Sequence, residues 1–270
     1  MIYYFSGTGN SLYVARHLAD AIDERLSPMT LGFPYQEATE GEAVGLVFPV
    51  YGWGIPNVVE RFIRSGALRA AGKGSYLYAV MTCGDDMGYA DEVLDAALQS
   101  AIGRKVDAAF SVLMPDVYVC LPGFDVDSKE ECREKFEQEE VVVKEIAGSV
   151  SRREAVRRLK RGGFPWTKTY VIRPLFNRYL VTDKYFRVDA SRCVSCGRCR
   201  KMCPVGNIVL KENVGEKGTE SKEVPHWQSH CTGCLACYHA CPHHAINFGT
   251  MTQKKGQYNL LRMQNEIMKE

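Results

Sequence analysis

Two copies of one cysteine pattern near the end of the chain restrict how it can fold more than any other feature. Each copy reads CxxCxxCxxxCP. The cysteines are Cys193, Cys196, Cys199 and Cys203 in the first copy, and Cys231, Cys234, Cys237 and Cys241 in the second. A compact run of thiolates that ends in a proline is typical of proteins that hold two iron-sulfur clusters.

The spacing also predicts how the cysteines divide between two 4Fe-4S clusters. Three cysteines at intervals of three wrap a tight loop around one cluster, whereas the fourth starts a helical turn that carries it toward the other cluster. We therefore expect a crossed arrangement. One cluster would take Cys193, Cys196, Cys199 and Cys241, and the other would take Cys231, Cys234, Cys237 and Cys203.

Disulfides and zinc are two other uses of cysteine, and both fit this pattern less well. Disulfide frameworks occur in oxidising compartments, which proteins usually reach by means of a signal peptide. Here an apolar run that suits a core strand begins at Met1, so we expect no signal peptide. Zinc is usually held by two separated CxxC pairs. The chain has eleven cysteines, and thiolates that await iron need a reducing interior, so the expected location is cytoplasmic.

The beginning of the chain predicts a site for an anion. The apolar run at 1–5 (MIYYF) suits a buried strand, and it leads into a loop of glycine and hydroxyl residues that opens a helical pattern. Backbone N–H groups at a helix N-terminus and such hydroxyls can surround a phosphate group. The loop consists of Ser6, Gly7, Thr8, Gly9, Asn10 and Ser11. Because it lacks a lysine and the last glycine of a dinucleotide fingerprint, we expect a monophosphate.

Two further loops follow apolar runs and are expected at the same edge of a parallel sheet. The first contains Pro49, Val50, Tyr51, Gly52 and Trp53, and the second contains Thr82, Cys83, Gly84 and Gly88. Ligands of open parallel sheets lie beyond the carboxyl ends of the strands, so these loops should border one site. Flat rings on a glycine-rich backbone suit a flavin. The plainer alternative is that Trp53 packs on the next helix and Cys83 fills space.

Both ends of the chain resemble known electron carriers. The loop SGTGNS resembles the phosphate loop of flavodoxins, whose cofactor is flavin mononucleotide (FMN), and residues 187–250 resemble bacterial two-cluster ferredoxins with a longer connection, expected as a surface loop at 211–223. The whole chain resembles the flavodoxin and ferredoxin fusion proteins of anaerobic microbes. This resemblance implies a flavodoxin-like, doubly wound parallel α/β sheet and a second, smaller α+β ferredoxin-like domain with two clusters.

The pattern along the chain predicts the order of segments. We expect a flavodoxin-like FMN-binding domain at 1–165, a connector at 166–186, a two-cluster ferredoxin domain at 187–250 and a C-terminal tail at 251–270. Strands are expected near 1–6, 43–49, 75–82 and 106–113, with a weaker candidate at 26–33, and helices near 10–24, 56–70 and 87–102. A capping box at 128–131 starts a long helix that Gly162, Gly163 and Pro165 end.

The net charge and the hydropathy of the chain exclude two classes of partner. The net charge of +2 favours no strongly electrostatic partner, so we expect no nucleic acid. No stretch approaches the length of a membrane span, and the most apolar connector, 166–186, contains several charged residues, so we expect no membrane span.

The motifs predict intracellular electron transfer between a bound FMN and two 4Fe-4S clusters, which would link one- and two-electron carriers. The expected partners are redox proteins, namely ferredoxin or flavoprotein donors and acceptors. No acid, base or nucleophile constellation is evident, so we assign no catalytic residue and leave open whether the protein is an enzyme, an oxidoreductase. Two alternatives remain: a flavin-dependent reductase of a quinone or nitro compound fed through the clusters, and a redox-sensing binding module with structural clusters.

Overall fold

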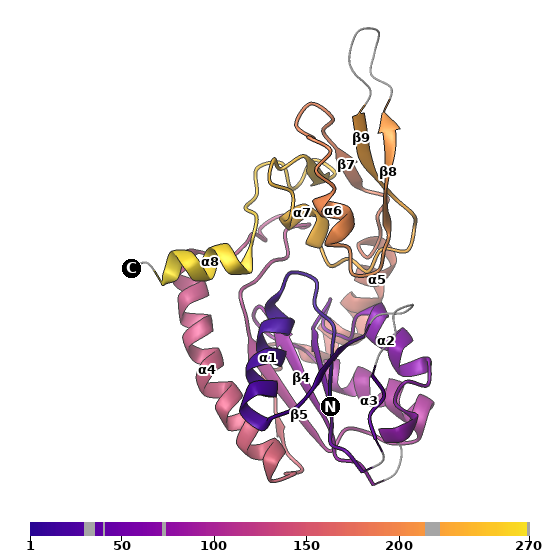
Figure 1. Ribbon diagram of the computed structural model, residues 1–270, viewed down its shortest axis with the longest axis vertical. Helices are drawn as coiled ribbons and strands as arrows, with labels where there is room; N and C mark the ends of the chain where they lie inside the picture. The colour runs from indigo at the N-terminus through magenta and orange to yellow at the C-terminus, as the bar shows by residue number, and fades with distance from the viewer. Residues whose placement is uncertain (30–35, 40, 72–73, 214–221, 269–270) are drawn as a thin grey trace.

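The computed structural model describes residues 1–29, 36–39, 41–71, 74–213 and 222–268, which form two parts (Figure 1). The larger part contains a six-stranded sheet in the order β2-β1-β3-β4-β5-β6, in which all neighbours are parallel. Its strands are β1 (Ile2–Tyr4), β2 (Leu26–Pro28), β3 (Val44–Pro49), β4 (Leu77–Cys83), β5 (Ala108–Leu113) and β6 (Arg157–Arg158). The order of the first five strands is that of the flavodoxin-like doubly wound fold.

Helices cover both faces of this sheet. They are α1 (Asn10–Ile22), α2 (Asn57–Arg64), α3 (Ala90–Ile102) and α4 (Lys129–Ser151), with a 3-10 turn at Arg69–Ala71. Successive strand residues point to opposite faces: Leu46 and Phe48 join the core under α2 and α3, whereas Val47 joins the core under α1 and α4. The predicted fold class is confirmed. In the candidate strand at 26–33, residues 26–28 are extended, and 30–33 lie outside the described residues.

The long helix begins where the sequence predicts. Ser128 Oγ accepts a hydrogen bond from Glu131 N at 3.2 Å, and the Glu131 carboxylate accepts one from Ser128 N at 2.8 Å. This pair of hydrogen bonds is the predicted capping box.

The predicted end of that helix at Gly162 was wrong. The helix α4 stops at Ser151, and the following residues return to the sheet as β6. Arg157 in β6 donates to the carboxylates of Asp91 at 3.0 Å and Asp95 at 2.7 Å, which are buried on α3. Buried carboxylates need cationic partners, so the basic residues serve these carboxylates instead of extending the helix.

The smaller part is an α+β unit, as predicted. Strand β7 (Phe186–Val188) pairs antiparallel with β10 (Ile246–Phe248), and β8 (Ile208–Asn213) pairs antiparallel with β9 (Lys222–Trp227). Two short helices follow the cysteine loops, α6 (Arg198–Lys201) and α7 (Ala236–His239). The surface loop expected at 211–223 was wrong at both ends, because 211–213 and 222–223 belong to the hairpin, and 214–221 lie outside the described residues.

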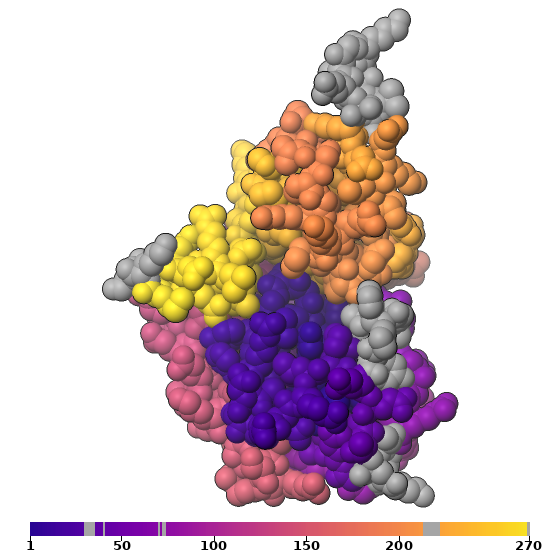
Figure 2. Space-filling view, viewed as in Figure 1, coloured from indigo at the N-terminus to yellow at the C-terminus, as the bar shows by residue number. Residues whose placement is uncertain are grey.

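Two segments tie the parts together. The chain crosses between them through a π-helix (Thr167–Ile172) that continues as α5 (Arg173–Tyr179), where the two parts meet in Figure 1. The last helix, α8 (Leu260–Ile267), packs against α4 of the larger part (Figures 1 and 2). No helix among the described residues is both long and apolar enough to span a bilayer.

Candidate functional site

The first group of cysteines draws on both motifs. A small cavity is lined by Cys193, Cys196, Cys199 and Cys241. The loop before α6 folds tightly because Ser195 and Gly197 adopt left-handed φ values of 55° and 68°. The structure therefore brings together the four cysteines that the crossed arrangement assigns to one cluster.

The surroundings of Cys237 define the second group. Burial raises the pKa of the Cys237 thiol well above its usual value, and the nearby thiols of Cys234, Cys231 and Cys203 raise it too. Cys203 belongs to the first motif, and the other three belong to the second. Buried thiols so close together cannot all ionise without a compensating positive charge, which the iron of a cluster supplies. The donor set therefore fits a cluster with crossed ligands.

Backbone N–H groups support the fourth cysteine of each motif in the same way. Asn207 N donates to Cys203 Sγ at 3.2 Å, and Ala245 N donates to Cys241 Sγ at 3.2 Å. In both cases the donor lies four residues after the cysteine. Hydrogen bonds of this kind are among the features that set the reduction potential of a cluster.

The loop at residues 6–11 forms the start of α1. Gly9 has a φ of 108°, a left-handed value that lets the chain turn from β1 into the helix. No described side chain caps the first turn of α1, so its N–H groups remain available to an anion. Ser11 Oγ and Thr82 Oγ1 lie 2.8 Å apart and share one hydrogen bond, which leaves one hydroxyl proton for a ligand.

The second loop turns sharply between Tyr51 and Gly54. The backbone N–H of each residue donates to the carbonyl of the other, at 3.0 and 3.2 Å. The two residues between them, Gly52 and Trp53, have φ values of 54° and 57°. A positive φ strains a bulky residue, and Thr169 Oγ1 stabilises the turn by donating to Trp53 O at 3.0 Å.

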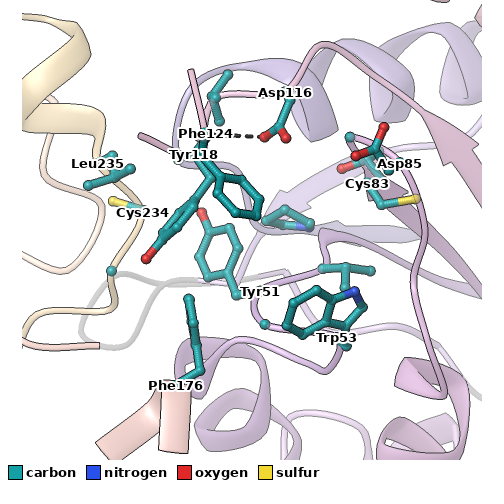
Figure 3. Close-up of a pocket in the computed structure, with 18 of the residues that line it drawn as sticks. Tyr51, Trp53, Cys83, Asp85, Asp116, Tyr118, Phe124, Phe176, Cys234 and Leu235 are labelled. Carbon is teal, nitrogen blue, oxygen red and sulfur yellow. Dashed lines mark hydrogen bonds between the residues drawn. The ribbon is translucent and has the colours of Figure 1, made fainter. Parts of the chain in front are cut away.

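These loops meet around a cavity of about 670 Å³ at the carboxyl ends of the strands (Figure 3). Thirteen of the fifteen residues that the sequence predicts as cofactor-binding line it: Ser6, Gly7, Thr8, Asn10, Ser11, Pro49, Val50, Tyr51, Gly52, Trp53, Thr82, Cys83 and Gly84. The other two do not border it. Gly9 precedes α1 beside Leu260, and Gly88 packs under Trp53 and Thr169.

The cavity also has walls that the sequence did not predict. One is the loop after β5 (residues 114–118), a second is the face of α5 that carries Phe176, and a third is Cys234 with Leu235. Aromatic side chains on the chain after β5 are a weak signal for the first wall. The other two arise from contacts between distant segments and leave no local pattern.

The polar groups of the cavity have unmet hydrogen-bonding capacity. The hydroxyl of Tyr118 and the Oδ1 atom of Asp86 are buried and have no hydrogen-bond partner among the described residues. Burial raises the pKa of Cys83, which also lines the cavity, to about 12, so that thiol is protonated at neutral pH. An elongated ligand with an anionic end, a flat ring and polar edges fits this lining.

The phosphate loop and the second cysteine group touch at one point. A Cβ atom added to Gly7 would lie 2.7 Å from Cys234 Cβ and 2.8 Å from the hydroxyl oxygen of Tyr51. Figure 3 shows Tyr51 between Cys234 on one side and Trp53 on the other. Burial and the nearby thiols of Cys234 and Cys231 raise the pKa of Tyr51 well above its usual value, so its hydroxyl stays neutral. The second cysteine group therefore lies at the wall of the cavity.

Comparisons with known proteins find relatives of the smaller part. A family described as a 4Fe-4S dicluster domain matches residues 185–248. An uncharacterized ferredoxin of Methanocaldococcus jannaschii is 31% identical over 72 residues, which cover 27% of this chain and 87% of that protein. A second uncharacterized ferredoxin of the same organism is 35% identical over 66 residues, which cover 22% of this chain and 35% of that protein.

Among solved structures, a flavodoxin from Streptococcus pneumonia TIGR4 covers 55% of this chain and 97% of its own, with 14% identity and a TM-score of 0.32. The strand order of the sheet, rather than this likeness, identifies the fold of the larger part.

Proposed function

Because the chain belongs to the ferredoxins with a 4Fe-4S dicluster domain, we propose that it transfers electrons between two such clusters and an FMN held in the cavity. One observation carries this proposal: residues 6–8 of the phosphate loop and Cys234 of the second motif line the same cavity. When bound, FMN exchanges one or two electrons and each cluster exchanges one, so a single chain can link the two kinds of carrier.

In this proposal the eight cysteines ligate the clusters in the crossed arrangement. The group around Cys199 lies in the smaller part, and the group around Cys234 lies at the wall of the cavity. The cluster nearer the FMN is therefore the one held by Cys231, Cys234, Cys237 and Cys203. The order of the centres along the chain of transfer is the first cluster, the second cluster and the flavin.

The loop at residues 6–11 would hold the phosphate group. Its partners are the open N–H groups of α1 and the hydroxyl proton left by the pair of Ser11 and Thr82. Trp53 and Tyr118 would contact the flat ring, and the unpaired hydroxyl of Tyr118 would gain a partner. Phe176 on α5 closes one side of the cavity and limits the access of water.

The proposal also includes the domain boundaries. We assign 1–165 to the flavodoxin-like FMN-binding domain and 187–250 to the ferredoxin domain. The segment 166–186 is then both a connector and a cavity wall, and 251–270 returns to the larger part through Tyr258, whose hydroxyl donates to Asn10 Oδ1 at 2.7 Å.

The first experiment is a cofactor analysis of protein purified without oxygen and then incubated with excess FMN. We expect about eight iron and about eight sulfide per chain, as two cubanes require, together with one FMN. Zinc without sulfide would end the ferredoxin assignment. Failure to retain FMN would end the assignment of the cavity.

A double variant tests the phosphate site. Replacing Thr8 and Ser11 by Ala removes hydroxyl partners of a dianion, each worth about 1.5–3 kcal/mol. The dissociation constant of FMN, measured by fluorescence quenching, should rise at least about tenfold. The matched control is Ser100→Ala, an exposed serine on α3, which should bind FMN like the wild type. Equal affinity in the double variant and the control would place the flavin elsewhere.

A further inference from the structure

The segment between the two parts exposes an unusual amount of apolar surface. Eight of the fifteen large apolar side chains that are exposed in the described part of the chain lie between residues 164 and 185. They are Phe164, Trp166, Tyr170, Val171, Ile172, Leu175, Tyr179 and Tyr185, with exposed fractions from 41% to 83%. We refer to these eight residues as the connector patch. Large apolar side chains that are exposed and concentrated in one segment mark an interaction site.

One part of the connector patch borders the cavity. Ile172, Leu175 and Tyr179 belong to the patch and also line the cavity, next to Phe176. In the segment 167–179, apolar side chains therefore both line the cavity and are exposed to solvent. Exposed apolar side chains gathered in one segment are normally covered by a partner. The cavity and its ligand contact only one side of this segment, so its solvent side is open to a partner.

The charge of the segment indicates which kind of partner would cover it. From 160 to 187 the chain has seven cationic residues and one acidic residue, Asp183. Two of the cations, Arg161 and Lys168, form ion pairs with Asp91 and Asp86 of the larger part, so the free positive charge comes from the others. The Asp183 carboxylate is already used, because it accepts hydrogen bonds from Asn207 Nδ2 and Ser229 N at 2.9 and 2.8 Å. Arg178 and Lys184 form no ion pair with any described residue. The surface is apolar and basic, which complements a partner that is apolar and acidic.

Two other covers fit less well. Two copies of this surface would repel each other in a symmetric dimer, since both are basic. A helix that lies on a membrane gathers its cations on one strongly polar face, whereas here Lys168 lines the cavity and pairs with Asp86, and Arg173 packs against Gly54. The content of aromatic residues and arginine is instead that of protein interfaces, where Trp, Tyr and Arg supply most of the binding energy.

We propose that the connector patch, with Arg178 and Lys184, is the docking surface for a small acidic electron-carrier protein of the ferredoxin type. This inference rests on the proposed function, and it adds where the carrier binds. A carrier on the patch lies beside the cavity, and electrons pass between its cluster and the centre in the cavity. The carrier is oxidised by one electron as that centre is reduced, or the reverse, and no bond is made or broken.

The test measures binding of a purified acidic two-cluster ferredoxin to the full-length holoprotein by calorimetry at low and high salt. Val171→Asp places a negative charge within the patch, where it would repel an acidic partner, and should weaken binding at least about tenfold. The matched control is Val141→Asp on α4, because Val141 is also a helical valine, 58% exposed against 45% for Val171. The control should bind within about twofold of the wild type.

A second variant guards against a folding defect. Arg178→Glu changes an exposed side chain, and it should both weaken binding and reduce its dependence on salt. Four results would overturn the proposal: no binding by the wild type, equal binding by the Val171 and Val141 variants, a wild-type dimer that Val171→Asp dissociates, or binding to vesicles containing phosphatidylserine that Val171→Asp abolishes. The FMN content of the same samples tests the proposed function separately, since a flavin-free protein that still binds the ferredoxin here would refute the flavin alone.

Discussion

Gly7→Ala is the substitution that most directly perturbs the contact between the two parts. The new Cβ atom would lie 2.7 Å from Cys234 Cβ, 2.8 Å from the Tyr51 hydroxyl oxygen and 3.2 Å from Cys234 O. Carbon atoms in contact prefer separations of about 3.5–4.0 Å, so the phosphate loop and the second cysteine loop must separate by about 1 Å. Two of the three nearest atoms belong to the Cys234 backbone or its Cβ, which cannot rotate away.

Overpacking of this kind costs about 1–3 kcal/mol. In a chain of this size, the melting temperature should fall by roughly 2–10 °C. FMN should also bind more weakly, because Gly7 lines the cavity. The assay is thermal unfolding of the anaerobic holoprotein by circular dichroism, combined with a fluorescence titration of FMN.

The matched control is Gly163→Ala, because a Cβ at Gly163 meets no atom within 4 Å and its φ is not in the left-handed region. This variant should melt like the wild type or slightly higher, since alanine restricts the unfolded chain. If Gly7→Ala melts and binds FMN like Gly163→Ala, the two parts do not touch at this point and the account of the cavity wall is refuted.

Three further predictions concern stability and reactivity. Arg157→Ala removes the cation shared by two buried carboxylates of α3, of which Asp91 keeps Arg161, whereas Asp95 keeps no other cation among the described residues; the loss should destabilise the protein by about 3 kcal/mol in urea unfolding. The neighbouring Arg158→Ala removes only ion pairs of 3.8 Å and should cost about 0–1 kcal/mol, so similar losses would contradict the role of Arg157. Burial raises the pKa of the Glu139 carboxyl, so the folded protein binds its proton more tightly than the unfolded chain does and loses stability as pH rises above the pKa of the unfolded chain. The melting temperature of Glu139→Gln should therefore rise relative to that of the wild type between pH 5 and pH 8. A difference in melting temperature that is the same at both pH values would refute this. The Cys83 thiol, with a pKa of about 12, should resist iodoacetamide at pH 7.5 in mass spectrometry, and rapid alkylation would show that it is a thiolate.

The parts of the fold that the sequence predicted well are those with local causes. The capping box at Ser128 and Glu131 forms because both partners lie within one helical turn. The loop at residues 6–11 turns from strand to helix because Gly9 adopts a left-handed φ without cost. The cysteine groups assemble because the spacing within each motif limits where each thiol can point.

Features with distant causes were missed. Strand β6 has two residues, both arginine, and it joins the sheet because Asp91 and Asp95 lie on α3 far earlier in the chain. Phe176 and Cys234 became walls of the cavity only because the smaller part packs on the larger part. No periodicity or motif near either residue carries that information. In the sequence, the segment 166–186 mixes apolar and charged residues. Only its surroundings in the structure show that its apolar side chains both line the cavity and face solvent.

The most direct test of the central claim is flash photoreduction of FMN in the intact, anaerobic holoprotein with oxidised clusters. If the flavin lies beside the second cluster, reduction of the flavin is followed by bleaching of cluster absorbance at a rate that does not change when the protein is diluted tenfold, because the transfer occurs within one chain. Cluster bleaching whose rate falls in proportion to protein concentration, or a reduced flavin that never bleaches the clusters, would contradict the account.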